Sequence, residues 1–459
     1  MPSETTGADP RAAVDDYLTA HLEEALDDLA RLCRQPSVAA QQLGMAECAE
    51  LTATLLRAHG FTAEVLPTGG APVVYGEAPG ASDKTLLCYN HYDVQPAEPL
   101  DLWQSPPFEP TRRDGRLYAR GVSDDKGHIV SRLAAIRALR AVHGELPCRV
   151  KFIIEGEEEI GSTHLPAFIA AHRNLLAADG CLWEFGMVDY EGRPTTYLGM
   201  RGDFYVELAV RALDHDAHSG LGGSIFPNAA WRLVWALATL KGPDELITIP
   251  GWYDDVREPS ARDLELLARL PDDEARLKES FGLDRFLGGA TGVALRRQAV
   301  FVPTCTISGL TSGYQGPGSK TVLPAAASAK VDFRLVPEQN PADLLVKLRR
   351  HLDERGFADV EIAQLGGERA ARTDPDAPFV RLVAATAQEV YGQPLVLAPL
   401  SGGSGPMHPF VKYLGVPIAN AGIGSPNSNA HAPNEFIVID EFLRGARHVA
   451  RIIAGMAGL

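Results

Sequence analysis

Residues 85–96, TLLCYNHYDVQP, give the clearest indication of the fold of this chain. The first five residues form a short apolar run of the kind found in strands that are buried on both faces of a parallel sheet. His91 and Asp93 follow this run directly. Because ligands of open α/β sheets bind beyond the carboxyl ends of the strands, the segment predicts a buried strand with a polar site at its end.

The segments on either side of this stretch repeat the pattern. A helix is expected to begin at Pro10 after the N-cap Asp9, and two more are expected over residues 45–58 and 126–142, where apolar residues recur at helical spacing. Residues 149–154, RVKFII, predict another buried strand, again followed by acidic residues. Strands that alternate with helices predict an α/β fold with a mostly parallel sheet and helices on both faces.

The pattern changes near residue 200. Residues 204–210, FYVELAV, and 327–335, ASAKVDFRL, alternate polar and apolar side chains, as strands with one exposed face do. Amphipathic helices are expected over residues 227–240 and 342–355, and a sheet-packing helix follows over residues 380–390. We therefore predict a smaller α+β domain with an antiparallel sheet over residues 200–372, inserted between the two parts of the first domain, 1–199 and 373–459.

The composition limits the classes of function. The 459 residues include 59 acidic and 43 basic side chains, a net charge of −16, which argues against binding to nucleic acids or to anionic membranes. The six cysteines are scattered and form no C-x-x-C pair, as expected in a reducing compartment. The first ten residues lack the pattern of a signal peptide, and no apolar run reaches the ~20 residues of a membrane helix. A cytoplasmic protein is the expectation.

Five short segments carry candidate chemistry, and each also has an ordinary structural interpretation. A single His-x-Asp pair is often a surface or capping pair, the SDDKG segment suits a helix N-terminus, and a glutamate run is often a solvated face. Glu184 lies among apolar neighbours after a predicted strand, where a carboxylate needs a partner or a metal. The candidate residues are His91, Asp93, Asp124, Glu157, Glu158, Glu159, Glu184 and His431.

Taken together, these residues favour a metal site. Two imidazoles, from His91 and His431, and three carboxylates, from Asp124, Glu159 and Glu184, are ligands suited to Zn²⁺, Mn²⁺ or Co²⁺. The absence of thiolates argues against a structural zinc. Other cofactor and nucleophile patterns fail. The GLGG segment at residues 220–223 lacks the G-x-G-x-x-G spacing of a dinucleotide loop, and Pro406 replaces the last glycine of a G-x-S-x-G elbow around Ser404.

At these residues the chain resembles the metal-dependent exopeptidases that include carnosinase-type dipeptidases, aminoacylase, carboxypeptidase G, acetylornithine deacetylase and succinyl-diaminopimelate desuccinylase. The resemblance extends over nearly the whole chain, in order. Its motifs are HYDVQP (91–96), ARGVSDDKG (119–127), EGEEEIGS (155–162), CLWE (181–184), HSG (218–220), SKTVLP (319–324), RLVP (334–337), GGSGP (402–406) and NAHAPNE (429–435).

The resemblance implies two divalent cations, with Zn²⁺ the first expectation and Mn²⁺ or Co²⁺ the alternatives. Asp124 matches the carboxylate that bridges the two ions. His91 and Glu184 match the remaining ligands of one ion, and Glu159 and His431 match those of the other.

The resemblance also implies roles in catalysis and substrate binding. Glu158 matches the general base that activates a water bridging the metals, and Asp93 matches the acid that supports His91. His218 matches a histidine that reaches the active site of a partner subunit, so the inserted domain is expected to act as a lid and to form a homodimer. Arg334 and Ser404 resemble groups that bind the carboxylate end of the substrate.

The expected function is hydrolysis of amide bonds in dipeptides or small peptide-like substrates with a free carboxylate, as in dipeptidases or carboxypeptidases. The alternative is hydrolysis of N-acyl amino acids with the same machinery. The motifs look like the dipeptidase branch, in which the position of Glu184 is usually Asp, whereas Glu is usual in the carboxypeptidase and deacylase members. Two further hypotheses come from other classes of function: a binding protein without catalytic activity, and a structural assembly protein.

Overall fold

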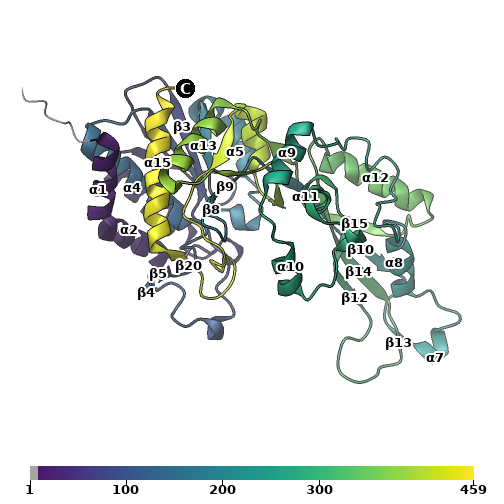
Figure 1. Ribbon diagram of the computed structural model, residues 1–459. Coiled ribbons are helices and arrows are strands. Elements are labelled where there is room, and N and C mark those ends of the chain that lie inside the picture. The colour runs from purple at the N-terminus through teal and green to yellow at the C-terminus, as the bar shows by residue number, and fades with distance from the viewer. Residues whose placement is uncertain (1–8) are drawn as a thin grey trace, which may run out of the picture. The chain divides into compact units, whose positions relative to one another are not determined.

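Figure 1 shows the computed structural model, which describes residues 9–459. The chain forms two compact units. The first comprises Met1–Leu198, Thr373–Pro399 and Pro409–Leu459, and the second comprises Gly199–Arg372 and Leu400–His408. The expectation about a signal peptide rests on residues 1–10, of which 1–8 lie outside the described residues.

The first unit is built on a six-stranded sheet in the order β1-β2-β6-β3-β7-β19. Strands β6, β3, β7 and β19 run parallel, whereas β2 pairs antiparallel with both β6 and β1. The strands are β1 (Thr62–Leu66), β2 (Val73–Ala78), β3 (Thr85–His91), β6 (Arg149–Glu155), β7 (Gly180–Trp183) and β19 (Ile418–Asn420). The sequence did not predict the antiparallel hairpin of β1 and β2 at one edge.

Helices bury the central strands of this sheet. All seven residues of β3 are buried, so both faces of the strand are covered. Helices α4 and α15 pack against each other and against β3, α3 packs against β1 and β2, and α13 packs against β19. The main helices are α1 (Pro10–Ala20), α2 (Leu22–Arg34), α3 (Met45–Ala58), α4 (Lys126–His143), α5 (Leu165–Ala171), α13 (Pro378–Tyr391) and α15 (Ile439–Met456). The predicted α/β class with a mostly parallel sheet is confirmed.

Two small three-stranded sheets complete the first unit. One has the order β20-β5-β4 and the other the order β17-β9-β8. Their strands are β4 (Thr111–Arg113), β5 (Arg116–Tyr118), β8 (Met187–Val188), β9 (Pro194–Tyr197), β17 (Val396–Ala398) and β20 (Phe436–Val438). The pairing of β20 with β5 brings the C-terminal region beside residues 116–118, far away in the sequence.

The second unit has an antiparallel sheet in the order β12-β14-β10-β15. Its apolar side chains alternate along the strands and pack with α8 and α12 into a separate core. The main elements are β10 (Gly199–Arg211), β11 (Ala217–His218), α7 (Ser219–Gly222), α8 (Ala229–Leu237), α9 (Ala261–Arg269), α10 (Glu274–Phe281), α11 (Gly292–Phe301), β12 (Thr306–Ser312), β13 (Val322–Leu323), β14 (Ala326–Leu335), α12 (Pro341–Glu354), β15 (Glu361–Glu368), β16 (Ala371–Arg372) and β18 (Ser401–Ser404). β18 joins the unit from a distant part of the chain by pairing with β10.

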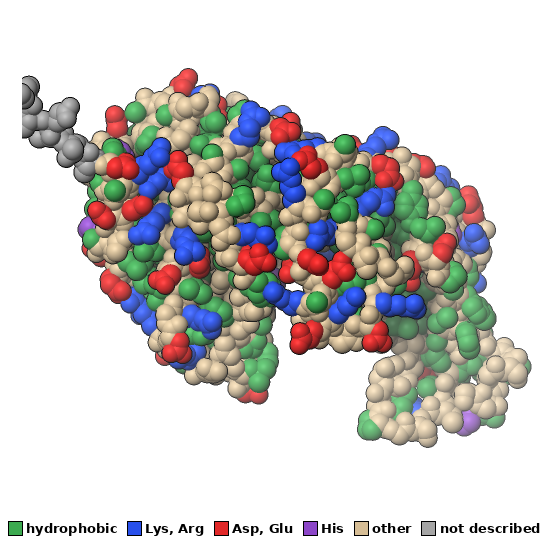
Figure 2. Space-filling model, viewed as in Figure 1, with side chains coloured by type: hydrophobic (Ala, Val, Ile, Leu, Met, Phe, Trp, Pro, Cys, Tyr) green, Lys and Arg blue, Asp and Glu red, His purple; other side chains and the backbone are tan. Residues whose placement is uncertain are grey.

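The surface carries charges of both signs. On the face shown in Figure 2, basic and acidic side chains are interspersed. Within the described residues, no helix has the length and apolar character needed to cross a membrane.

Candidate metal centre

The candidate ligands leave neighbouring strands at one edge of the sheet. His91 is the last residue of β3, and Glu184 follows the end of β7 directly. Glu158 and Glu159 lie just beyond β6, in a 3₁₀ turn at Glu158–Ile160. Because β6, β3 and β7 are adjacent and parallel, their carboxyl ends bring these side chains together.

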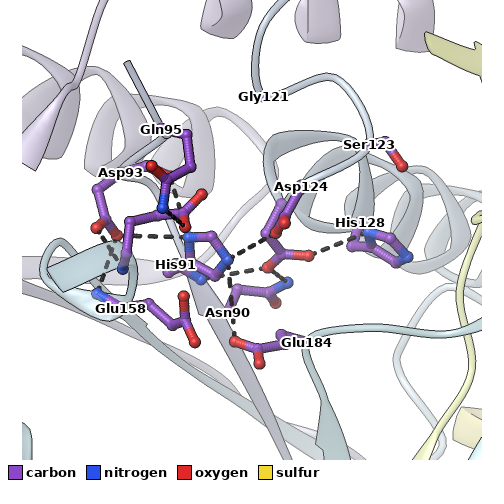
Figure 3. Close-up of polar contacts among 12 residues, drawn as sticks. Asn90, His91, Asp93, Gln95, Gly121, Ser123, Asp124, His128, Glu158 and Glu184 are labelled. Atoms are coloured by element: carbon purple, nitrogen blue, oxygen red, sulfur yellow. Dashed lines mark hydrogen bonds and ion pairs between the residues drawn. The ribbon is translucent and has the colours of Figure 1, made fainter. Parts of the chain in front are cut away.

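Asp124 lies at the centre of the cluster, and Figure 3 shows it beside His91. Each of its two oxygens faces an imidazole. Its Oδ1 is 3.0 Å from Nε2 of His91, and its Oδ2 is 3.0 Å from Nε2 of His431. Nε2 of His431 is also 3.2 Å from Oε2 of Glu159, and Nε2 of His91 is 4.0 Å from Oε2 of Glu184. The five residues therefore form two groups that share Asp124.

Asp93 supports the cluster from behind His91. Its carboxylate accepts hydrogen bonds from the backbone N–H groups of Glu158 (3.3 Å) and Glu159 (2.9 Å). Nδ1 of His91 lies 3.0 Å from the backbone oxygen of Asp93 and 3.4 Å from its carboxylate Oδ1. A proton on Nδ1 is held by these acceptors, which leaves Nε2 as the nitrogen that can bind a metal.

The cluster concentrates negative charge in a poorly solvated place. Burial, together with the carboxylates of Asp124 and Glu159, raises the pKa of Glu158 well above its usual range. Burial and the neighbouring Glu158 likewise raise the pKa of Glu184, whose buried Oε2 has no hydrogen-bond partner. Carboxylates packed in this way need a compensating positive charge.

Divalent cations fit the donors that are present. Asp124, Glu159 and His431 can each offer one ligand atom, and these atoms lie within 4.8 Å of one another. The unpartnered oxygen of Glu184 beside His91 and Asp124 suits a second ion. Imidazoles and carboxylates without thiolates are a ligand set for Zn²⁺, Mn²⁺ or Co²⁺.

The other predicted site residues lie in the second unit. Arg334 donates from Nη1 to Oγ of Ser404 at 2.8 Å and from Nε to Oδ2 of Asp332 at 3.2 Å, so the structure brings Arg334 and Ser404 together. His218 ends β11 with its side chain exposed, and its Nδ1 accepts the backbone N–H of Gly220 at 3.0 Å. This contact leaves Nε2 of His218 as the nitrogen available to another group.

Three residues that were not singled out from the sequence also hold the cluster. Gln95 donates to Oε2 of Glu159 at 2.8 Å. Asp125 accepts from the side chain of Asn90 (2.6 Å) and from the backbone N–H of His91 (3.2 Å). These contacts orient metal-ligand candidates through groups that would not themselves touch a metal.

The third of these residues, Arg132, is fully buried in α4. Its guanidinium donates to the backbone oxygens of Tyr89 (2.8 Å) and Glu184 (3.2 Å), and so ties the ends of β3 and β7 together. The sequence does carry a sign that Arg132 has a special role, because its charged side chain interrupts the apolar stripe of the helix predicted over residues 126–142.

The sheet carries a cluster of His and carboxylate side chains at its carboxyl edge, so this α/β protein has a candidate metal centre there. The sequence profile described as peptidase family M20/M25/M40 matches residues 87–455. The chain belongs to this family, and the predicted family resemblance is confirmed.

Individual relatives carry related names. A solved M20 family metallo-carboxypeptidase of Sulfolobus solfataricus is 37% identical, with 95% of this chain and 100% of that chain covered and a TM-score of 0.91. Human β-Ala-His dipeptidase is 31% identical over 62% of this chain and 56% of its own length. A Cys-Gly metallodipeptidase of Schizosaccharomyces pombe is 28% identical over 81% of this chain and 79% of its own.

The match to the human dipeptidase and its two rodent counterparts is partial. The chain spans 56–58% of the length of these three relatives.

Proposed function

We propose that this protein hydrolyses amide bonds in dipeptides or other small peptide-like substrates with a free carboxylate, using two divalent cations. The observation that carries this proposal is the position of Asp124, whose two oxygens each face an imidazole at 3.0 Å. His91, Asp124 and Glu184 would hold one ion, and Asp124, Glu159 and His431 the other. Zn²⁺ is the first expectation, and Mn²⁺ or Co²⁺ the alternatives.

The chemistry divides between the ions and the protein. When bound, divalent cations lower the pKa of water and polarise carbonyl groups. Glu158 then acts as the general base, which removes the proton from the attacking water and later delivers it to the leaving amine. Its position supports this role, because its backbone N–H is held by Asp93 while its carboxylate lies among the candidate ligands. Asp93 would fix the tautomer of His91.

The second unit would bind substrate. The pair of Arg334 and Ser404 suits the carboxylate end of a peptide, because a guanidinium can bind both oxygens of a carboxylate. His218 would stabilise the oxyanion in the active site of a partner subunit. We accordingly assign the catalytic role to residues 1–199 and 373–459, and the lid and dimerisation role to residues 200–372.

Exposed apolar side chains on the second unit support a homodimer. Leu221, Ile225, Trp231 and Trp235 are all more than half exposed. Apolar side chains gather over α8 in Figure 2, and β12 is an edge strand of its sheet. Large exposed apolar patches and unpaired strand edges mark surfaces for association.

The cellular location is a further proposal. All six cysteines are buried and unpaired. Free thiols are typical of reducing compartments, which supports a cytoplasmic protein.

The close alternative is an N-acyl-amino-acid amidohydrolase. Glu184 supports it, because glutamate at this position resembles the deacylase and carboxypeptidase members more than the dipeptidases. The dipeptidase names of the human and fission yeast relatives support the leading proposal.

A substrate comparison separates these two proposals. We expect the purified protein, loaded with Zn²⁺ or Mn²⁺, to hydrolyse Ala-Ala and other unblocked dipeptides with a kcat/KM at least about tenfold above that for N-acetyl amino acids. A tenfold preference corresponds to about 1.4 kcal/mol of transition-state binding. Release of free amino acids, followed by chromatography, measures both reactions. Hydrolysis of the acylated set alone would refute the dipeptidase proposal in favour of the amidohydrolase.

A further inference from the structure

Glu435 is fully buried, although it is none of the candidate ligands. Its Oε2 accepts hydrogen bonds from Nη1 of Arg120 (2.7 Å) and the backbone N–H of Gly121 (2.9 Å). Its Oε1 accepts from the backbone N–H groups of Ser123 (2.8 Å) and Asp124 (3.0 Å). One carboxylate therefore holds three N–H groups of the loop that carries Asp124.

The same residue is fixed to the segment that carries His431, only four positions earlier in the chain. The register of β20 on β5 pairs Phe436 with Tyr118, and the backbone N–H of Ala119 donates to the backbone oxygen of Glu435 at 3.2 Å. Glu435 thus lies where the C-terminal segment meets the start of the Asp124 loop. Residues more than 300 positions apart are joined at this point.

The segment before Glu435 needs such an anchor. His431 has a left-handed backbone with φ 63°, and three asparagines nearby share this conformation: Asn427 (61°), Asn429 (56°) and Asn434 (62°). Non-glycine residues adopt this conformation less readily than glycine, and contacts around the segment help to hold it. Asn434 supplies one set of contacts, since its side chain bonds the backbone oxygen of Leu102 at 2.8 Å and accepts from the N–H of Gln104 at 2.8 Å. Glu435 supplies the other.

Arg120 balances the charge of this anchor. Its side chain is 1% exposed and that of Glu435 is 0% exposed. Nη2 of Arg120 also donates to the backbone oxygen of Pro96 at 3.2 Å, in the segment that follows His91 and Asp93. The buried pair therefore links three segments of the site without adding net charge.

We propose that Glu435 is a positioning residue that fixes Asp124 and His431 relative to each other, so that Oδ2 of Asp124 and Nε2 of His431 face the same cation. The inference rests on the proposed metal-dependent function. Glu435 makes no contact with the metal or substrate in this role. It sets the affinity for the metal through the backbone of the Asp124 loop and the segment before β20.

The test is a competition titration of metal-free protein with Zn²⁺ and a chromophoric chelator. Replacement of a residue that orients metal ligands commonly costs about 10–100-fold in metal affinity. We expect E435Q to raise the Kd of at least one of two Zn²⁺ ions by this factor. E435D keeps the charge but shortens the reach by one methylene, and we expect it to raise the Kd less. Thermal unfolding of each metal-free variant measures any loss of stability separately.

D263N is the matched control. Asp263 is also a buried carboxylate that pairs with an arginine, Arg372, and accepts a backbone N–H, from Ser260 at 2.8 Å, but it lies in the second unit. We expect D263N to lower thermal stability while both Kd values stay within about twofold of wild type.

The outcomes separate the inference from the proposed function. The role of Glu435 would be overturned if both Kd values of E435Q stayed within about twofold of wild type. It would also be overturned if D263N lost as much Zn²⁺ affinity as E435Q. If E435Q does not fold, E435D decides, and unchanged Kd values in E435D would overturn the role. Wild-type protein that binds no Zn²⁺ would instead contradict the proposed function.

Discussion

Replacement of Glu158 by glutamine is expected to lower kcat by about 10²–10⁴-fold, the usual contribution of a general base. Glutamine keeps the shape of the side chain but cannot take up a proton. The backbone N–H of residue 158 would still donate to Asp93, so the turn that carries Glu159 should persist. Steady-state kinetics on a dipeptide and elemental analysis of the same samples measure activity and metal content together.

The neighbouring Glu157 offers a matched control. Its carboxylate accepts a hydrogen bond from the backbone N–H of Ala71 at 3.1 Å and lies 2.7 Å from Nδ1 of His164, neither of which is a candidate ligand. We expect E157Q to keep kcat within about tenfold of wild type, since it removes one charge from the same glutamate run. Glu158 is not the base if E158Q retains full turnover. If E158Q retains its metal and loses turnover, a non-catalytic binding protein is excluded.

Replacement of Asp124 by asparagine is expected to abolish activity and metal binding together. Asp124 faces both imidazoles, so the substitution removes an anionic ligand from both candidate sites at once. Because Asp124 would bind the metals directly, its replacement should reduce the metal affinity by more than the roughly 100-fold upper range for residues that only orient ligands. Elemental analysis after gel filtration should find fewer than one ion per chain where wild type holds two.

D179N controls for loss of an aspartate from the same unit. Oδ2 of Asp179 accepts the backbone N–H of Thr85 at 2.8 Å, at the amino end of β3, whereas the cluster lies at the carboxyl ends of the strands. D179N should keep its metal content. Two ions in D124N would refute the bridging role, and loss of metal in D179N would show that the assay reports stability.

Local signals explain why several elements were predictable. Residues 45–58 form α3 as expected, and α4 ends at His143, one residue beyond the prediction, before Gly144 in a positive-φ conformation (83°). Apolar residues recur at helical spacing from Val14 to Leu32, so the helix expected to begin at Pro10 showed no sign of an interruption. In the structure, α1 ends at Ala20 and α2 begins at Leu22. His21 separates them, stacked on Tyr17 with ring centroids 3.8 Å apart. No Gly or Pro marks this break, so residue pattern alone could not reveal it.

The candidate site was predictable to a similar degree. His91 and Glu184 lie at the carboxyl ends of strands that the sequence marks as buried, and parallel strands bring these ends to one edge. The contacts of Arg132 and Glu435 depend on which backbone groups face them after folding. Glu435 lies in the NAHAPNE motif, but its partners are more than 300 residues away. Spacing along the chain carries no information about such partners.

The arrangement of two cations around Asp124 is tested most directly by anomalous diffraction from crystals of the Zn²⁺-loaded protein. We expect two anomalous peaks within bonding distance of the Asp124 carboxylate, one beside His91 and Glu184 and the other beside Glu159 and His431. A fully loaded crystal with no peak at Asp124 would contradict a metal centre built from these five residues.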